Sequence, residues 1–537
     1  MAKQKAKNAS PNKVKTGSDQ TTEWSFYSIA KFLFIGATVV FLWIGHYVYL
    51  FTLFENDRFF SHLSDLEREM SYRTEMGLYF SYYKTLIEAP SFHQGLYSIT
   101  HDNLTEAGHT INTLQRFNLY PEVYLGFLFR VFRGVSDHLK IEWQSCFNVR
   151  RGSDLPPVTS CEGIGNSHYF YIHGAFLTAG GVLPAVFLLG YLLSQSYVGG
   201  ITSVVAFMVN HGHATRAQWT PPLRETFGYP VFCLQLYLVT WALKQQRVSK
   251  WAFIGLTFLT THFILFWQFS GFVLFTQVTC IFCSYILGYV SMGNLSKLTS
   301  HYILSFLLSF AMLFGNLMLL SSLFFTSLMS ILVIIALRPL ERISNRFIFM
   351  TLNLALYLFF TFFIKYAMNT FAGIHDDSHV FEILRSKFTS YSSFHTSLYT
   401  CAVEFDFIDG ETLRSISLTG LLPLSAASFL LVALAIIRNL FDATADQRKN
   451  LAPVVYNAGQ FVLFCLMSSL IMRLKLFAVP HLCIFVPAVF NQDIQMAVFK
   501  KRFPWANTLV VVYIGLLAFQ GQENIRETTE HSWRIQQ

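Results

Sequence analysis

The stretch FLFIGATVVFLWIGHYVYLFTLF, residues 32–54, decides the class of this chain because it is a long apolar run without a charged side chain. A membrane-spanning helix needs roughly 20 such residues, since the bilayer hydrocarbon is about 30 Å thick and each helical residue rises about 1.5 Å. No small-residue cleavage site follows the run, so we interpret it as a signal anchor that stays in the protein. The preceding tail carries five lysines, which predicts that residues 1–25 are cytoplasmic and that the chain from residue 55 is luminal.

The composition of the whole chain agrees with that interpretation, because 53% of its residues are hydrophobic, 17% are aromatic and only 13% are charged. This balance excludes an ordinary soluble globular protein and predicts an all-α polytopic membrane protein. Apolar run lengths predict about thirteen transmembrane helices. After the first, the predicted spans lie near residues 167–194, 199–213, 229–245, 251–268, 271–290, 302–317, 319–337, 347–367, 416–437, 453–472, 477–492 and 506–520. The Lys- and Arg-rich loops at 244–250, 338–346, 448–450 and 500–502 then all face the cytoplasm, as the positive-inside bias requires.

Alternation of these spans leaves three luminal loops, namely a long first loop at residues 55–166 and two others at 214–228 and 368–415. Within the first loop, the short apolar segment 119–132 is interrupted by Arg130, so we interpret it as an interfacial amphipathic helix.

Two features of the first loop suit the oxidising lumen of the secretory pathway. Cys146 and Cys161 flank a polar segment and are predicted to form a disulfide, the alternative being two unpaired thiols. Asn103-Leu104-Thr105 is a glycosylation sequon, so Asn103 is predicted to carry a glycan. The other six cysteines lie mostly in apolar runs and are interpreted as packing residues.

Basic side chains at the luminal ends of predicted spans run against the usual charge bias and need an explanation. They are Arg216 and Arg224 in HGHATRAQWTPPLRE, and Arg473 and Lys475 in MRLKLFAVPH. One interpretation is a lipid-linked phosphate, because a guanidinium fork matches phosphate oxygens and an acyl tail fits between helices. The alternative is that these side chains extend to lipid headgroups. The predicted substrate-binding set is Arg216, Trp219, Arg224, Arg473, Lys475 and His481, with Trp219 suited to stack on an acceptor or sugar ring.

The stretch REMSYRTEMGLYFSYYK, residues 68–84, is unusually charged for a segment that follows a span. Helical spacing brings Glu75 close to Tyr79, Tyr82 and Tyr83 on one face. The residues alone leave two interpretations open, an interfacial helix with a solvated charged edge or a helix that presents a catalytic carboxylate. Glu75 is followed by Met76-Gly77, where we expect glycine to allow a ligand close to the backbone.

No metal is predicted, although two groups of residues have ligand-like composition. His211 and His213 are two residues apart, which points them in different directions on a helix. Residues 375–379 open a luminal loop that we interpret as a cover over the acceptor groove, and the basic side chains already neutralise phosphate without a cation.

Several of these runs together resemble a known family. They are REMSYRTEMGLYFSYYK, INTLQRFNLYPEVYLGFLFR, CEGIGNSHYFYI, NHGHATRAQWTPPLRE, DDSHVFEILRSKFTS, FHTSLYTCAVEFDFI and MRLKLFAVPHLCI. They look like the protein tryptophan C-mannosyltransferases, the dumpy-nineteen-like family. The resemblance implies a GT-C glycosyltransferase fold in the endoplasmic reticulum membrane. It also implies transfer of mannose from dolichyl phosphate mannose, a donor substrate with no further cofactor, to indole C2 of tryptophan in WxxW or WxxC motifs. By the same resemblance, Glu75 is the catalytic carboxylate and Arg216 contacts the donor phosphate.

The resemblance sets the expected domain organisation and leaves alternatives. Residues 26–520 are expected to form the GT-C catalytic domain and 521–537 a short luminal tail, without the luminal domain that family members carry after their last span. The alternative functions are another mannosyltransferase that uses dolichyl phosphate mannose, or an inactive membrane scaffold. Glu75 could act as a base or stabilise positive charge on the indole, and both roles remain open.

Overall fold

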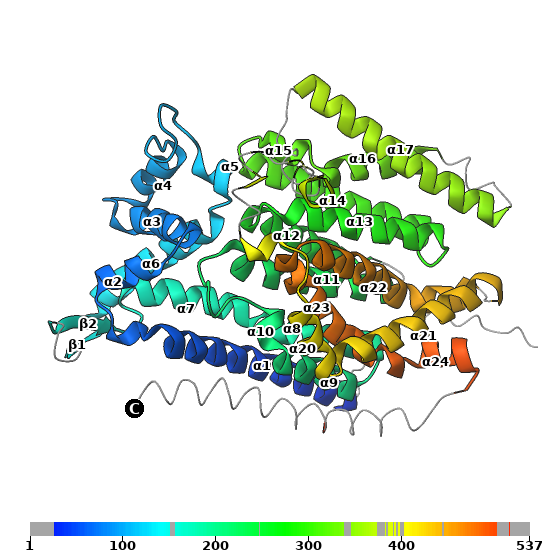
Figure 1. Ribbon diagram of the computed structural model, residues 1–537, viewed down its shortest axis with the longest axis horizontal. Coiled ribbons are helices and arrows are strands. Elements are labelled where there is room, and N and C mark those ends of the chain that lie inside the picture. Colours follow the sequence, from blue (N-terminus) through cyan, green and yellow to red (C-terminus); the bar gives the residue numbers. More distant parts are fainter. Residues whose placement is uncertain are drawn as a thin grey trace, which may run out of the picture.

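The computed structural model describes residues 26–150, 156–245, 248–337, 345–372, 402–442 and 445–501, with residue 515 and ten positions between 382 and 397. The predictions for the tail 1–25, the span 506–520, the tail 521–537 and the acidic segment 375–379 lie outside these residues, apart from position 515. Helices make up almost all of the regular structure in the described part (Figure 1).

The first long helix leads into a group of shorter elements, in the loop that the sequence predicts to be luminal. They are α1 (Phe26–Arg58), η1 (Phe60–His62), α2 (Asp65–Ser71), α3 (Glu75–Glu88), α4 (Phe92–Thr100), α5 (Thr113–Phe117), α6 (Tyr120–Leu139), β1 (Ser145–Val149) and β2 (Val158–Glu162). In Figure 1, α2, α3, α4 and α6 gather at one end of the molecule, beyond the ends of α1 and α7 (Ser167–Gly180).

The rest of the described chain forms a helical bundle. Its remaining elements are α8 (Val182–Ser194), α9 (Tyr197–Val209), α10 (His211–Ala214), α11 (Arg224–Lys244), α12 (Lys250–Phe266), α13 (Ser270–Ile286), α14 (Met292–Met312), α15 (Leu317–Leu320), α16 (Leu323–Ala336), α17 (Arg346–Ala372), η3 (Val403–Phe405), α20 (Gly410–Leu418), α21 (Leu421–Asp442), α22 (Ala445–Leu470), η4 (Met472–Leu474), α23 (Lys475–Phe485), η5 (Val486–Phe490) and α24 (Gln492–Phe499).

Membrane-spanning character is evident in the length and composition of these helices. In the described residues, seven helices are long and apolar enough to cross a bilayer, and four shorter apolar helices accompany them. This confirms the prediction of an all-α polytopic membrane protein, while the count of thirteen spans stays a prediction. The predicted span 167–194 consists of two consecutive helices, α7 and α8, which meet at Gly181.

The predicted amphipathic helix is present as α6 and is longer than expected. Its buried face includes Glu122, Leu125 and Phe129 and packs mainly on α3, whereas Phe127 and Leu128 are exposed. An amphipathic helix of this kind lies along a surface, and its place at the membrane interface stays a prediction.

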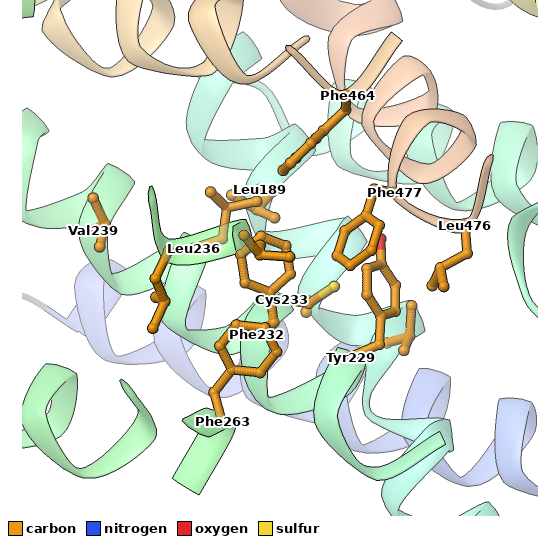
Figure 2. Close-up of a cluster of buried hydrophobic side chains, with 14 of the residues drawn as sticks. Leu189, Tyr229, Phe232, Cys233, Leu236, Val239, Phe263, Phe464, Leu476 and Phe477 are labelled. Atoms are coloured by element: carbon orange, nitrogen blue, oxygen red, sulfur yellow. The ribbon is translucent and has the colours of Figure 1, made fainter. Parts of the chain in front are cut away.

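Contacts between aromatic side chains join neighbouring helices at the centre of the bundle (Figure 2). The Phe477 ring of α23 lies 5.8 Å from that of Phe232 in α11 and 5.5 Å from that of Phe464 in α22, measured between centroids. Phe232 also contacts Phe263 of α12 at 5.2 Å. Offset and edge-to-face aromatic pairs add about 0.5–1.5 kcal/mol each beyond burial. The contacts therefore hold α11, α12, α22 and α23 in a defined relative position.

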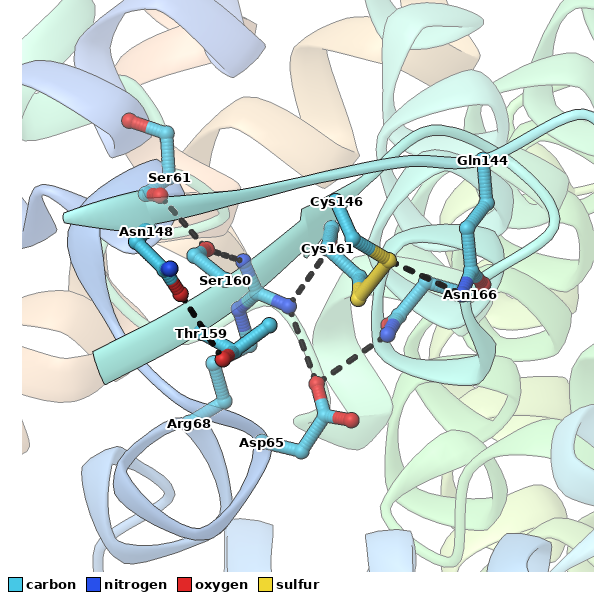
Figure 3. Close-up of a disulfide and its surroundings, with 10 residues drawn as sticks. All are labelled: Ser61, Asp65, Arg68, Gln144, Cys146, Asn148, Thr159, Ser160, Cys161 and Asn166. Carbon is cyan, nitrogen blue, oxygen red and sulfur yellow. Dashed lines mark hydrogen bonds and ion pairs between the residues drawn. A yellow bond between two sulfur atoms is a disulfide. The ribbon is translucent and has the colours of Figure 1, made fainter.

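In the long loop that follows α1, a disulfide joins two strands and a buried arginine connects them to α2 (Figure 3). Strands β1 and β2 pair antiparallel, and Cys146 and Cys161 face each other and form the predicted disulfide. Arg68, fully buried, donates to the Cys161 carbonyl at 2.8 Å and to Ser160 Oγ at 2.7 Å. It also pairs with Asp65 at 3.0 Å. Part of the charge in the stretch 68–84 therefore serves to fasten the hairpin to α2.

Candidate active site

Glu75 is the first residue of α3 and its side chain is exposed. The residue before it, Thr74, has φ 55° and ψ −130°, a left-handed backbone conformation that a β-branched residue rarely adopts. Strain of this kind costs of order 1–3 kcal/mol and persists where the surrounding structure needs the turn. The turn directs the chain so that the Glu75 carboxylate lies at the positive end of the α3 dipole.

The other two glutamates of the charged stretch have structural partners. Glu67 forms a capping box with Ser64 at the start of α2. Glu69 pairs with Lys84 of α3 at 2.6 Å. At Gly77 a Cβ would lie 3.0 Å from the Tyr72 carbonyl oxygen. Glycine at this position therefore lets the chain approach itself closely, and a ligand near this backbone stays a prediction.

Tyr79 lies one helical turn after Glu75, and its hydroxyl donates to Glu75 Oε2 at 3.4 Å. The Arg224 guanidinium lies 3.8 Å from the centroid of the Tyr79 ring. Burial raises the pKa of Tyr79 to about 12, although the positive charge of Arg224 acts in the opposite direction. The phenol therefore stays protonated, and its O–H group can donate a hydrogen bond to the Glu75 carboxylate.

Arg224 is held in a buried ion pair, an arrangement that favours a structural role over the predicted substrate-binding role. Both terminal nitrogens of its buried guanidinium pair with the two oxygens of the Glu122 carboxylate in α6, one at 2.7 Å. Nη1 also donates to the Asn118 carbonyl at 3.2 Å. Both terminal nitrogens are thus occupied by protein oxygens, and Nε is buried without a hydrogen-bond partner.

Two other predicted arginines come together around acidic side chains. The two terminal nitrogens of Arg216 donate to the two carboxylate oxygens of Glu404 in η3, with one distance of 2.8 Å. Arg473 Nη2 lies 3.2 Å and 3.3 Å from the oxygens of Glu225, in the first turn of α11. Arg216 Nη1 lies 3.9 Å from Glu225 Oε1. Glu225 therefore bridges both arginines.

Lys475 belongs to the same group of charges, because it interacts electrostatically with Arg216, Glu404 and Asp409. Glu75 acts electrostatically on Arg473. Contacts around the start of α11 connect the two groups: Arg224 lies on the ring of Tyr79, which reaches Glu75, and Glu225 contacts Arg473 and Arg216.

A narrow cleft lies beside Arg216, and its empty volume of about 280 Å³ includes the open solvent at its mouth. Its lining residues come from α7, α8, the loop before α11, α11 and α23, and they are Ala179, Val182, Thr215, Arg216, Ala217, Glu225, Thr226, Tyr229, Pro230 and Leu476. Arg216 and Glu225 give it a charged end, while Val182, Tyr229 and Leu476 are apolar. Tyr229 and Leu476 also appear in the aromatic core of Figure 2. The cleft therefore joins a charged end to an apolar wall, and it would have to widen to admit a ligand larger than water.

Two further predicted binding residues differ in their placement. Trp219 lies in the loop after Arg216 and is 43% exposed, so its indole face is accessible. His481 is 3% exposed, and its Nε2 donates to the Asn457 carbonyl at 3.0 Å within the bundle. This buried position favours a packing role over the predicted substrate-binding role, because α23 carries His481 into the core.

Other sequence-predicted positions have ordinary structural surroundings. Asn103 is exposed, as glycosylation requires, and its modification stays a prediction. His211 contacts His46, with 3.1 Å between their Nε2 atoms, whereas His213 contacts Ser415 Oγ at 3.1 Å. The two histidines therefore have separate partners.

Sequence reasoning missed Glu122, Glu225 and Glu404 as parts of the site. Each stands in one of the runs quoted above for the family resemblance, and each lies close in space to a predicted arginine. The available signal was the presence of an acidic residue in each of these runs, because an arginine that becomes buried needs a carboxylate partner.

Comparison with known proteins identifies the family. A family model described as "Dpy19: Q-cell neuroblast polarisation" matches residues 40–535. The chain belongs to the Dpy19 family. A relative from Caenorhabditis elegans named "C-mannosyltransferase dpy-19" is 43% identical over 98% of this chain and 77% of its own length. A human relative named "Protein C-mannosyl-transferase DPY19L1" is 40% identical over 91% of this chain and 73% of its own length. Because its relatives in the Dpy19 family are named as C-mannosyltransferases, the chain is a member of a glycosyltransferase family.

Proposed function

We propose that this protein transfers mannose from dolichyl phosphate mannose to the indole C2 of tryptophan in WxxW or WxxC motifs of proteins in the endoplasmic reticulum lumen. The names of its Dpy19 relatives support C-mannosyl transfer. The lipid-linked donor and the tryptophan acceptor come from the family resemblance of the sequence motifs, and the geometry of the site is compatible with both.

One observation carries the proposal. A series of contacts connects Glu75 with Arg473, although they lie nearly 400 positions apart in the chain. The Tyr79 hydroxyl reaches Glu75 and its ring lies on Arg224, while Glu225, the residue after Arg224, binds Arg473. A group-transfer site needs an acid or base close to cations that stabilise the leaving phosphate. The region between Glu75 and Arg473 has both.

The donor would bind with its phosphate among Arg216, Arg473 and Lys475. Because guanidinium groups recognise phosphate oxygens as they recognise carboxylates, the phosphate would replace Glu404 on Arg216. The apolar wall of the cleft, including Val182, Tyr229 and Leu476, would then accommodate the first isoprene units of the lipid.

In the transfer step, the bond between mannose C1 and the phosphate oxygen breaks and a bond between C1 and indole C2 forms. The electron pair of the broken bond stays on dolichyl phosphate, where Arg216 and Arg473 stabilise the negative charge. The proton on indole C2 must then leave to restore aromaticity. Glu75 is the group proposed to accept this proton or to stabilise the positive charge that develops on the ring.

The test is an in vitro assay of the purified full chain with dolichyl phosphate mannose and a WxxW peptide. Mass spectrometry of the product should locate the hexose on the indole carbon, and GDP-mannose should not replace the lipid-linked donor. A hexose on a hydroxyl oxygen would identify a different mannosyltransferase. Absence of transfer by a correctly folded protein would support the inactive scaffold.

A further inference from the structure

The first two residues of α11, Arg224 and Glu225, direct their side chains to different parts of the candidate active site. Glu225 contacts Arg473 and lies 3.9 Å from Arg216, on the side proposed to bind phosphate. Arg224 contacts Glu122 and the ring of Tyr79, on the side of Glu75. The start of α11 therefore connects the two sets of groups.

The ion pair between Arg224 and Glu122 is built as a rigid support. The two side chains are 6% and 0% exposed, and the guanidinium meets the carboxylate with two parallel N–H···O bonds. Tyr171 of α7 donates to Glu122 Oε1 at 2.9 Å. Planar, bidentate pairs of this kind restrict both partners to one geometry.

Tyr79 rests on this support. Its ring stacks on the Arg224 guanidinium at 3.8 Å, a favourable cation–π distance, so the ring cannot shift without disturbing the buried pair. From this position its hydroxyl reaches Glu75 Oε2, four residues earlier on the same face of α3.

We propose that Tyr79, held by the Arg224–Glu122 ion pair, is a positioning residue that orients the Glu75 carboxylate for the transfer step. This inference rests on the proposed function, in which Glu75 is the reacting carboxylate. The Glu75 side chain is exposed at a helix start, so it has several rotamers available and a fixed donor selects among them. Effective transfer requires the carboxylate to be close to its reacting position before the substrates arrive.

The first test is Tyr79→Phe, which removes the hydroxyl and keeps the ring on Arg224. We expect kcat to fall about three- to tenfold, in the range for one long hydrogen bond to a charged group. The KM for dolichyl phosphate mannose and the melting temperature should stay the same, because the phosphate-side groups and the packing are unchanged. A purely structural tyrosine would instead lower the melting temperature and leave kcat unchanged.

Tyr82→Phe is the matched control on the same helix. The hydroxyl of Tyr82 also bonds to a carboxylate, Asp102 at 2.7 Å, but this carboxylate belongs to the α4–α5 connection and lies away from Glu75. Its kcat should equal that of the unmodified protein. Equal losses of kcat in Tyr79→Phe and Tyr82→Phe would overturn the inference.

The support itself is tested with Glu122→Gln, and Arg68→Lys serves as the control for disturbing a buried arginine site. Glu122→Gln should lower kcat per folded molecule by about tenfold with a small change in donor KM. The reason is that Arg224 loses its carboxylate partner, so the Tyr79 ring that lies on it is no longer fixed in position. Arg68→Lys should reduce the yield of folded protein without changing kcat per folded molecule. If Glu122→Gln does not fold, Tyr79→Phe remains decisive because it preserves the ion pair.

A double-mutant cycle shows whether Tyr79 acts through Glu75. Tyr79→Phe should cause no further loss when it is added to Glu75→Gln, with product measured over long incubations. Independent, multiplicative losses would overturn the inference. If the unmodified protein transfers mannose to tryptophan and Tyr79→Phe matches it, only this inference fails. If the unmodified protein makes no C-mannosyl product, the proposed function fails and this inference with it.

Discussion

Arg216 and Glu404 form a bidentate ion pair across 188 positions of sequence. Glu404 stands in η3, a short segment that is attached to η4 by a hydrogen bond from the Met472 amide to the Asp406 carbonyl at 2.9 Å. The carboxylate occupies the face of Arg216 that a phosphate would need. Under the proposed function, donor binding and the Glu404 contact are therefore competitive.

Glu404→Gln should lower the apparent KM for dolichyl phosphate mannose about two- to fivefold. A partly exposed ion pair is worth up to about 1 kcal/mol, and the donor no longer has to displace it. Initial rates over a donor concentration series measure the change. Glu411→Gln, an exposed acid at the start of α20, is the control and should leave KM unchanged. A higher KM in Glu404→Gln would mean that Glu404 supports donor binding.

Arg216→Ala should weaken donor binding, whereas Arg224→Ala should lower the stability of the fold, although both arginines were expected to bind the donor. Arg216→Ala should fold and raise the donor KM roughly ten- to a hundredfold, since one charge-assisted hydrogen-bonded contact of about 1.5–3 kcal/mol is lost. Arg224→Ala leaves Glu122 buried without its partner and should lower the free energy of unfolding by about 3–5 kcal/mol. Donor kinetics and thermal melting of both variants separate the two effects. A stable Arg224→Ala with a raised donor KM would contradict the structure.

Glu75→Gln should reduce transfer to a WxxW peptide by about 10² to 10⁴ without lowering the melting temperature. The amide keeps the volume of the side chain but cannot accept a proton at neutral pH. Glu67→Gln and Glu69→Gln should keep most activity and lose up to about 1 kcal/mol of stability, through the capping box and the Lys84 ion pair. Near-normal transfer by Glu75→Gln would show that another group reacts.

Asn103 tests the membrane topology. If residues 55–166 are luminal, glycosidase treatment of microsomes should shift the mobility of the protein, and Asn103→Gln should abolish the shift. A protease-accessible first loop on the cytoplasmic side of sealed microsomes would contradict the signal-anchor interpretation of residues 32–54.

The class of the fold was predictable from the sequence because span length and apolarity are local properties. The run 32–54 lies within α1, and the amphipathic helix around Arg130 appears as α6. The disulfide followed from two cysteines in an oxidising compartment. Glu75 was selected by a motif, it is the first residue of α3, and its catalytic role stays a prediction.

The partners of the charged residues were decided only by the tertiary structure. Arg216, Arg224 and Arg473 are equivalent in sequence, each a basic residue at the luminal end of a predicted span. Packing makes Arg224 a buried support, leaves Arg216 at the cleft, places Arg473 on Glu225, and turns His481 into the core. Whether a guanidinium binds a ligand or a neighbour depends on which carboxylates the folded chain brings within about 3 Å of it. Those carboxylates lie 102 to 248 positions away in sequence, beyond the reach of any local pattern.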